Sequence, residues 1–458
     1  MTTPIPDNLR DLTRDDLIEL ILQQAEDIRR LQAEVAALKK PPTTSRNSSQ
    51  PPSRDWKSNR PARKRGKRRG AQAGHVKAAR PLVEKPDTVI DVRVRACTNC
   101  GTDLSTVAPQ RTLRRQITEL PEIKPVVIET RQDEVMCPCC QQLQRGVLPE
   151  GLEATRQFGP RLEGLVTYFH HEHHMGFERT QTVFQDVLGL SISEGGTVAI
   201  IERAGEVAQP EAEAIGEQVR QSEVIGSDET SARVNGRNWW EWVFRSPLGE
   251  YHLIVPSRGQ DVIDAFMRDA RAQVWKSDCW KPHLNAPAEL HQLCIAHQLR
   301  NLQGLIDQRP RLRWAREMQD LFRGAVHLWH RRDELTAPGF QGQVTRLENH
   351  LDELLHRRVT GRLAVNLLDR YRTHCEHLFV FLHRPDVSPD NNACERALRP
   401  SVIHRKVMGS FRSEWGPHAY AALATVLNTA KRAGENVFQK LVSLMGKPVL
   451  HYLDLQMV

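Results

Sequence analysis

The sequence lacks the features of a membrane or exported protein. No stretch reaches about 18 consecutive apolar residues, the length that a helix needs to cross a bilayer. The start, Met1 to Pro6, lacks the basic and then apolar pattern of a signal peptide. The 9 cysteines are then more often metal ligands, buried apolar residues or reactive thiols than disulfides. We therefore expect a soluble, unexported protein without a membrane partner.

One segment also lacks acidic residues. Between residues 41 and 80 the only acid is Asp55, and Pro, Ser, Asn and basic residues dominate. No apolar periodicity is present to build a core, so we interpret residues 41–90 as a disordered basic linker. Its cations can neutralise phosphates and give salt-dependent affinity for DNA without specificity; a merely solvated linker is the alternative. The cations that we expect at DNA are Arg63, Lys64, Arg65, Lys67, Arg68 and Arg69.

The whole chain is long and basic. Its 458 residues exceed one ordinary folding unit, so we expect about two to four units. Lys and Arg number 64 against 56 Asp and Glu, which gives a net charge of +8 and favours a polyanionic partner.

Residues 1–40 show a heptad pattern. Ile21, Ile28 and Val35 share one heptad position, and Leu17, Leu31 and Leu38 share the other. β-Branched residues at the first position with Leu at the second favour a parallel two-stranded coiled coil. We predict a weak dimer zipper, with a single amphipathic helix lying on its own protein as the alternative.

Paired cysteines mark residues 91–150. Cys97 and Cys100 are followed, after 36 residues, by Cys137, Cys139 and Cys140. Two Cys-x-x-Cys turns present four sulfurs in the tetrahedron that Zn²⁺ accepts, so we predict a structural zinc site at Cys97, Cys100, Cys137 and Cys140. Cys139 remains an alternative to Cys140. Residues 126–130 and 134–136 are predicted strands that bring the two turns together.

Residues 151–222 have a helical pattern. Residues 179–188 and 194–207 are predicted helices around a turn at 189–193 that contains Gly189, an arrangement found both in helix-turn-helix DNA readers and in ordinary bundles. If the second helix enters a major groove, Thr197 and Arg203 contribute to DNA specificity. The histidines at 170, 171, 173 and 174 point to different faces and are interpreted as polar surface with partial packing.

Two acids follow predicted strands. The strand 223–228 ends on Asp228, and Asn235-Gly236 supplies the residues of a tight hairpin. Strands at 238–244 and 251–255, a helix at 261–269 and a strand at 272–278 that ends on Asp278 complete the series. Three antiparallel strands, a helix and a fourth strand with acids at the first and fourth strand ends give the order of an RNase H-like nucleotidyl-transfer domain, which we place at 223–435.

A third acid is expected on a helix crossing near these strand ends. We expect Ser388 to cap that helix, Pro389 to lie in its first turn and Asn391 to share a face with Glu395. Arg396, Arg399, Arg405 and Lys406 follow and are candidates to hold phosphates. Residues 299–381 are a helical insertion and 436–458 a C-terminal tail. The fold class is therefore multidomain α+β, with a coiled-coil helix, a zinc-knuckle domain, a helical DNA-binding domain and the α/β catalytic domain.

The three acids suit two-metal chemistry. Two Mg²⁺ or Mn²⁺ ions about 3.5–4 Å apart need hard anionic oxygens, which Asp228, Asp278 and Glu395 supply while leaving positions open for a phosphate. Singly, each acid has an ordinary explanation as a turn former, a helix cap or a surface charge. Their combination favours catalysis.

The motifs together resemble the transposases of the bacterial insertion-sequence sixty-six family, over nearly the whole chain. The resemblance rests on 47–53 with the basic run and Gly74-His75, on the two cysteine turns, and on 228–243, 277–278, 294–297, 390–399 and 405–406. The sequence departs from the family at Cys279-Trp280, where a small residue and Tyr are common. In Cys294-Ile-Ala-His297, a packed Cys with a capping His and direct involvement in the mechanism both remain open.

The resemblance implies a transposase with a catalytic Asp, Asp and Glu that cleaves element ends and joins them to target DNA. Implied partners are terminal inverted repeats, target DNA, further copies of the chain and accessory proteins of the same element, at the bacterial nucleoid in the cytoplasm. The alternatives are a catalytically idle DNA-binding regulator derived from a transposase and a structure-selective nuclease. Strand joining, as opposed to cutting, distinguishes them.

Overall fold

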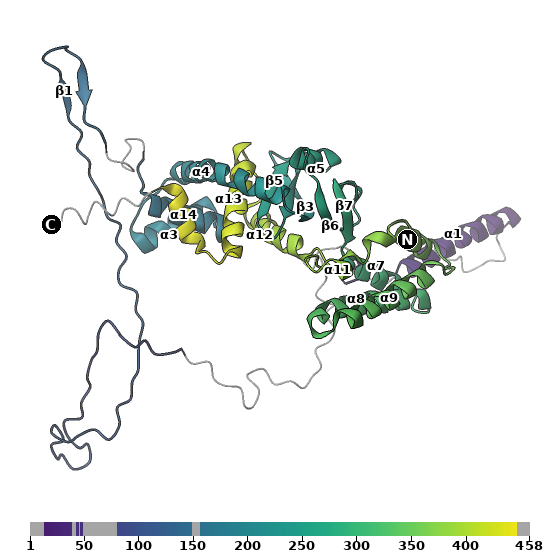
Figure 1. The fold of residues 1–458 in the computed structure, drawn as a ribbon, viewed down its shortest axis with the longest axis horizontal. Helices are drawn as coiled ribbons and strands as arrows, with labels where there is room; N and C mark the ends of the chain where they lie inside the picture. Colours follow the sequence, from purple (N-terminus) through teal and green to yellow (C-terminus); the bar gives the residue numbers. More distant parts are fainter. Residues whose placement is uncertain (1–12, 39–42, 45, 49–79, 149–155, 447–458) are drawn as a thin grey trace.

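The structure, a computed structural model, describes residues 13–38, 43–44, 46–48, 80–148 and 156–446. It contains a lone N-terminal helix, an extended segment at 80–148 and a body that begins at residue 156 (Figure 1). Within the described residues, no helix combines the length and the apolar character needed to cross a membrane.

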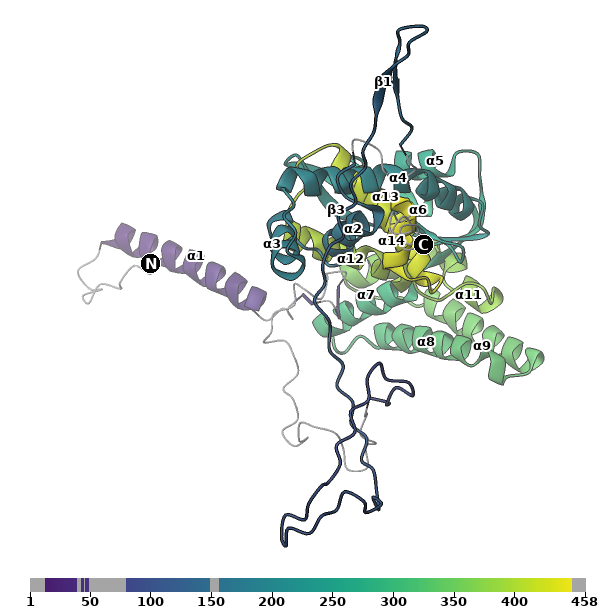
Figure 2. The same ribbon diagram turned by 90° about the vertical axis from the view of Figure 1, so that its left-hand side faces the viewer.

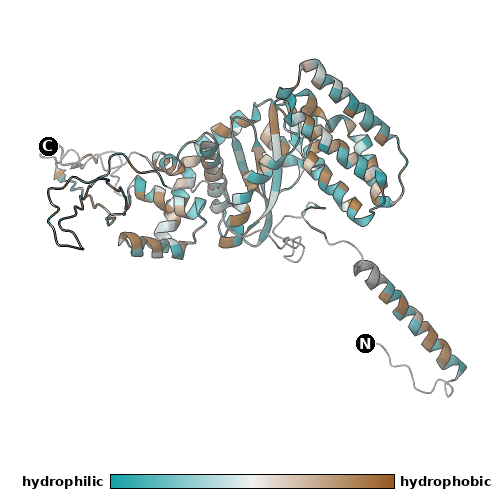
Figure 3. Cartoon of the chain, turned by 90° about the horizontal axis from the view of Figure 1, so that it is seen from below, coloured by the Kyte–Doolittle hydropathy of each residue, from teal (hydrophilic) through white to brown (hydrophobic). Residues whose placement is uncertain are grey.

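The N-terminal helix α1 (Arg14–Leu38) exposes part of the apolar row of the predicted zipper. It stands apart from the body in two views (Figures 2 and 3), and apolar residues recur along it (Figure 3). Ile21, Ile28 and Leu31 are 63%, 53% and 49% exposed. These three residues are therefore not buried against the described part of the same chain, whereas a helix packed on its own protein would bury them. The coiled coil itself stays a prediction.

The extended segment contains one short hairpin, β1 (Glu134–Met136) with β2 (Leu143–Arg145). The predicted strand at 134–136 is confirmed. The predicted strand at 126–130 is wrong, because those residues have no regular structure and Val127 is 91% exposed. An apolar run becomes a strand only where another strand or a core accepts it.

A five-stranded mixed sheet lies at the centre of the body, in the order β5-β4-β3-β6-β7. The strands are β3 (Val224–Val234), β4 (Arg237–Arg245), β5 (Glu250–Val255), β6 (Ala272–Ser277) and β7 (Ala288–Leu293). The first three form an antiparallel meander, and β6 and β7 run parallel to β3. Asn235 and Gly236 take φ of 47° and 74°, which a tight hairpin turn needs. The predicted meander and fourth strand are confirmed; β7 was not predicted.

The prediction that Asp228 ends its strand is wrong. β3 runs on for six residues to Val234, because its second half pairs with β4 and buries Ala232 and Val234. Asp228 therefore lies inside a continuous strand. Its local backbone is fixed by the antiparallel partner Val243.

Helices cover both faces of the sheet. One face packs against α4 (Glu194–Arg220), α5 (Gln260–Met267), α13 (Trp415–Arg432) and α14 (Val437–Met445), around the buried side chains Trp242, Phe244 and Trp275. On the other face, α12 (Asn392–Met408) covers Val243. The residues expected to begin a C-terminal tail thus form α14, which packs on α2 (Pro160–Thr167) and α13.

A helical subdomain separates β7 from α12. It consists of α7 (Ile295–Gln308), α8 (Arg313–His330), α9 (Ala337–Leu355), α10 (Arg362–Thr373) and α11 (Val380–His383), whereas the short helix α6 (Lys281–Leu284) connects β6 to β7. Trp314, Phe322 and Tyr371 form the centre of its core, which also includes Val224 and Val274 of the sheet. The subdomain is therefore packed onto the sheet at the end of β6.

The residues 46–48 dock on this subdomain. Asn47 donates from Nδ2 to Asp307 Oδ2 at 2.9 Å. A Cβ on Gly304 would overlap the carbonyl oxygen of Asn47, so α7 needs glycine where the segment crosses it. Residues 46–48 belong to the segment 41–90 that was predicted to be a disordered linker, and that prediction is wrong for them because they are attached to α7.

The predicted pair of helices before the sheet is confirmed. α3 (Phe177–Leu188) ends at Gly189 with φ of 62°, and Ser193 caps α4 by accepting from Gly196 N. The expectation that Thr197 and Arg203 meet DNA is wrong for Thr197, which is fully buried. Arg203 binds the buried Glu163 at 2.8 Å. This face of α4 serves packing because the helix is covered by α2 and α13.

Two of the four clustered histidines, His170 and His171, are buried, whereas His173 is exposed and His174 half-buried, so the interpretation as polar surface with partial packing is wrong for the first two. His170 and His171 lie on a π-helical turn (Tyr168–Glu172), where the wider turn brings neighbouring side chains inward. Burial lowers the pKa of His170 to about 4 and that of His404 to about 3. The rings are therefore neutral packing groups, and His170 stacks on Phe177.

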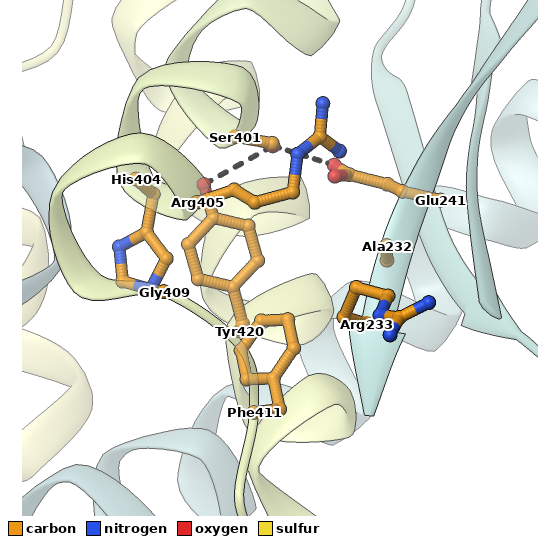
Figure 4. Close-up of a pocket in the computed structure, with 9 residues that line it drawn as sticks. All are labelled: Ala232, Arg233, Glu241, Ser401, His404, Arg405, Gly409, Phe411 and Tyr420. Atoms are coloured by element: carbon orange, nitrogen blue, oxygen red, sulfur yellow. Dashed lines mark hydrogen bonds between the residues drawn. The ribbon is translucent and has the colours of Figure 1, made fainter. Parts of the chain in front are cut away.

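A buried polar network joins the sheet to α12 and α13. Ser401 Oγ donates to Glu241 Oε1 at 2.6 Å and accepts from the Tyr420 hydroxyl at 3.1 Å, at the side of a cavity of about 10 Å³ (Figure 4). His252 Nδ1 lies 3.0 Å from the same carboxylate oxygen. Burial alone would lower the pKa of His252, but hydrogen bonds to Glu241 and Glu250 outweigh it and raise the pKa to about 9.

This network predicts a loss of stability in alkali. The folded chain holds the His252 proton more tightly than the unfolded chain, whose His pKa is about 6.5. The stabilisation is therefore complete below about pH 6.5 and disappears as pH rises through about 9. In urea titrations at pH 6.5 and 9.5, we expect wild type to lose on the order of 2 kcal/mol more than His252→Gln. Equal losses in the two proteins would show that His252 does not carry the effect.

Candidate active site

The register of two parallel strands places two aspartates at one edge of the sheet. Gly226 of β3 pairs with Lys276 of β6, and each aspartate lies two residues beyond its paired residue. Asp228 and Asp278 therefore occupy equivalent positions on adjacent strands, whose spacing is about 4.8 Å. Asp278 follows the last residue of β6, as predicted, and accepts the backbone N–H of Trp280 at 2.8 Å.

The helix α12 brings Glu395 to the same edge. Asn391 precedes the helix and donates from Nδ2 to the carbonyl of Ser227 at 2.7 Å, while its backbone N–H donates to Cys294 Sγ at 3.2 Å. A Cβ on Gly226 would lie 2.9 Å from Cys394 Sγ, so the helix approaches β3 more closely than a side chain allows. Glu395 lies in the first turn.

The predicted capping of α12 by Ser388 is wrong. The helix begins at Asn392, and the Ser388 hydroxyl donates instead to the carbonyl of Asp390 at 2.9 Å. Lys276 Nζ donates to Ser388 Oγ at 3.0 Å. Pro389 accepts the Ile295 N–H at 2.9 Å, which leaves the turn 388–391 outside the helix and bound to β6 and α7.

The acids repel one another. Asp228 is half-buried, and burial first, then the charges of Glu229, Asp278 and Glu395, raise its pKa well above the usual range. Three like charges at the edge of one sheet are unfavourable without a cation. The mutual effect is also evidence that the three predicted acids lie near one another.

Glu395 has cationic neighbours in this structure. Arg300 Nη2 lies 2.9 Å from Glu395 Oε1, and His297 Nε2 lies 3.6 Å from it. Among the described residues, no group of three or more His, Cys, Asp or Glu side chains is close enough together to hold one metal ion. Glu395 therefore forms an ion pair with Arg300 of α7, and its carboxylate does not converge with those of Asp228 and Asp278 on one metal position.

His297 and Cys294 have different surroundings. Cys294 is buried, precedes α7 and accepts the Asn391 N–H, so it has the packing role. His297 lies beside Glu395 and lines a cleft with Asp278; burial and the charge of Arg300 lower its pKa. Of the two, only the histidine faces the acids.

The residues on either side of Asp228, Ser227 and Glu229, are held by a chain of hydrogen bonds. Ser227 Oγ accepts from Trp275 Nε1 at 2.8 Å and lies 2.7 Å from His283 Nδ1. His283 Nε2 is 2.7 Å from Glu229 Oε2. Arg258 donates to the other oxygen of Glu229 through Nε and Nη2, at 2.9 and 2.7 Å.

These hydrogen bonds were not predicted from the sequence. Burial would raise the pKa of Glu229, but the hydrogen bonds and charges of His283 and Arg258 lower it, so that Glu229 stays ionised. The hydrogen-bonded partners are separated by up to 56 residues in the sequence, and the pairs form only in the fold. The adjacent acid in Asp228-Glu229 was the one available signal.

The predicted phosphate-binding cations differ in exposure. Arg396, Arg399 and Lys406 are exposed on α12. Arg405 is half-buried, contacts Thr230 Oγ1 at 3.4 Å and lines the small cavity of Figure 4. The cations of the basic linker, Arg63, Lys64, Arg65, Lys67, Arg68 and Arg69, lie outside the described residues.

The two cysteine turns are folded alike. In the first, Gly101 N donates to Cys97 O and Cys97 N to Thr102 O; in the second, Gln141 N donates to Cys137 O and Cys137 N to Gln142 O. Gly101 and Gln141 both take a positive φ, of 77° and 56°. The turns match residue for residue, although the four cysteines are not gathered as one metal-binding group in the described residues.

The close approach of α12 to β3 predicts a cost for any side chain at Gly226. Gly226→Ala forces Cys394 and Asn391 outward and should lower the free energy of unfolding by about 1–3 kcal/mol, measured by urea titration. Gly195→Ala is the control, because nothing lies within 4 Å of its new Cβ. That variant should be unchanged or more stable by up to about 1 kcal/mol. Equal behaviour of the two variants would contradict the tight contact.

Comparison with known proteins assigns the family. No match was found among curated proteins. The family model described as Transposase IS66 family matches residues 155–419, more than half of the 458-residue chain, and includes all three acids and the helical subdomain. The chain belongs to the IS66 family of transposases.

Proposed function

We propose that the chain cleaves element ends and transfers the strands to target DNA, with Asp228, Asp278 and Glu395 as ligands of two Mg²⁺ or Mn²⁺ ions. The observation that carries the proposal is the register of β3 with β6, which puts two aspartates at one edge under the helix of Glu395. The strand order, three antiparallel strands followed by two parallel ones, supports an RNase H-like catalytic domain.

The donor set fits divalent cations. All three side chains offer hard carboxylate oxygens, and the pKa of Asp228 is raised by burial and then by neighbouring negative charges that a cation would neutralise. When bound, the ions activate water or a 3′-hydroxyl and stabilise the leaving oxygen. To become a metal ligand together with the two aspartates, Glu395 must give up its ion pair with Arg300. Arg300 is then free to bind a phosphate of the same DNA.

The surrounding residues hold the acids in place. Asn391 fixes the start of α12 on β3, and Glu229, clamped by Arg258 and His283, keeps the strand beside Asp228 rigid. Such preorganisation matters because a misplacement of about 1 Å costs roughly 100-fold in rate. The Asn391 bond is buried, and the carboxylate of Glu229 is 4% exposed although the Arg258 side chain is 40% exposed, so water has little access to either acceptor.

DNA binding is divided between parts of the chain. The exposed Arg396, Arg399 and Lys406 are suited to phosphates near the acids, and the basic linker supplies affinity without specificity. α3 and the N-terminal turn of α4 remain candidates for recognising terminal inverted repeats. α1 exposes the apolar row that a dimer would bury, and synapsis of two ends requires at least a dimer. We also propose that accessory proteins encoded by the same element assist the chain, and that it acts at the bacterial nucleoid.

Zinc is proposed as a structural ion of residues 91–150. In each turn the first and fourth residues are cysteines, and the fifth has a positive φ, so Cys140 is the counterpart of Cys100. Cys139 corresponds to Asn99 and is not a ligand. Hydrogen bonds from Thr102 and Cys97 lower the pKa of Cys100 to about 7, and those from Cys140 and Cys139 lower the pKa of Cys137. The thiolate form that binds zinc is thus favoured before the metal arrives.

Removal of one carboxylate charge should abolish the reaction. Asp228→Asn, Asp278→Asn and Glu395→Gln keep the side-chain volume and should each lower cleavage and strand transfer by at least about 1000-fold, with DNA binding nearly unchanged. Both steps are measured on labelled duplexes that carry the element ends. Glu353→Gln, on the exposed side of α9, is the control and should behave as wild type.

Each other result has a distinct meaning. Strand transfer by any one of the three variants removes that acid from the site. Cleavage without joining by the wild type identifies the structure-selective nuclease. Binding without either reaction identifies the idle regulator.

Zinc content should depend on Cys140 and not on Cys139. Purified protein should carry about one Zn²⁺ per chain. Cys140→Ser and the pair Cys97→Ser with Cys100→Ser should lose it, while Cys139→Ser should retain it, because only Cys140 matches the first turn. The measurement is metal analysis after gel filtration. Full zinc in Cys140→Ser together with loss in Cys139→Ser would reverse the assignment.

A further inference from the structure

Trp280, Trp240 and Arg258 form an aromatic and cationic wall beside Asp278. Trp280 is 39% exposed, and it is the one tryptophan in the exposed class among the described residues. The guanidinium of Arg258 lies 4.3 Å from the ring centre of Trp280 and 4.5 Å from that of Trp240. The exposed part of the Trp280 indole offers apolar ring surface to a ligand, with the cation of Arg258 beside it.

The wall is held rigidly in relation to the acids. Arg258 is fixed by its two hydrogen bonds to Glu229, the neighbour of Asp228. The Trp280 backbone N–H donates to Asp278 Oδ1 at 2.8 Å, so the indole is joined to that acid through a two-residue turn. A ligand on the indole would therefore lie next to whatever Asp278 binds.

A cleft opens in front of this wall. Its volume is about 300 Å³, and its lining includes Arg258, Asp278, Trp280, His297, Asn301 and Arg370. The aromatic surface, two arginines and an amide together fit a nucleotide: a base to stack on the ring and a phosphate for the cations. A volume of this size is at the lower end for ligand pockets, which suits one base better than a duplex.

We propose that this cleft takes up one unpaired nucleotide beside the scissile phosphate, with its base stacked on Trp280. The inference rests on the proposed DNA cleavage at Asp228, Asp278 and Glu395. In a duplex both faces of a base are covered, so the nucleotide must leave the helix to occupy the cleft. Stacking on Trp280 then offsets part of the cost of unpairing and holds the neighbouring phosphate at the acids.

The test compares intact and abasic DNA. Duplexes with the element ends carry an abasic site in turn at each of three positions on either side of the cleaved bond. Binding is measured in Ca²⁺, so the result does not depend on cleavage. Trp280→Ala should weaken binding to intact DNA by roughly 5- to 100-fold, and at one position the abasic DNA should show no further loss. Trp280→Phe should retain most of the affinity.

The outcomes separate this inference from the proposed function. Loss of affinity in Trp280→Ala that is equal on intact DNA and on all abasic duplexes would show that Trp280 contacts something other than a base. No loss in Trp280→Ala would overturn the inference outright, even if the three acid variants prove inactive. Conversely, the stacking result stands on binding alone if strand transfer is not found.

Discussion

The close contact between α12 and β3 is the constraint on which the candidate active site depends. Like charges at one sheet edge repel, so the fold must hold them there by other means. Gly226 permits the helix to approach, Asn391 anchors its first turn on Ser227, and the buried network of Glu241, Ser401 and Tyr420 holds its middle. Interactions well away from Glu395 therefore determine where Glu395 lies.

Much of the sheet could be predicted because its signals are local. Asn235-Gly236 marks a hairpin by backbone conformation alone, and Asp278 follows a strand whose alternation is visible in the sequence. Asp228 was placed at a strand end because its apolar residues stop there, but pairing with β4 extends the strand. β7 was missed since Glu289, His291 and Gln292 give it little apolar character. Its place is set by pairing with β6.

Contacts between residues that are far apart in the chain cannot be predicted from local sequence patterns. Glu395 meets Arg300 across 95 residues, and Glu229 meets His283 across 54. Glu229 and Glu395 lie in recognisable motifs, but nothing in the sequence marks His283 or Arg300 as their partners. The burial of Thr197 and His170 was missed for a related reason: a polar residue on a helix looks exposed until its neighbours are known, here α2, α13 and α12.

The helical subdomain links DNA capture to the acids by physical attachment. α7 carries Arg300 and His297 at one part of its length and accepts Asn47 over Gly304 about one turn further on. Asn47 belongs to the predicted basic linker, residues 41–90, so the helix that pairs with Glu395 also holds one residue of that linker. The position of α7 therefore sets both the ion pair of Glu395 and the contact with Asn47, so a shift of this helix would change the two together.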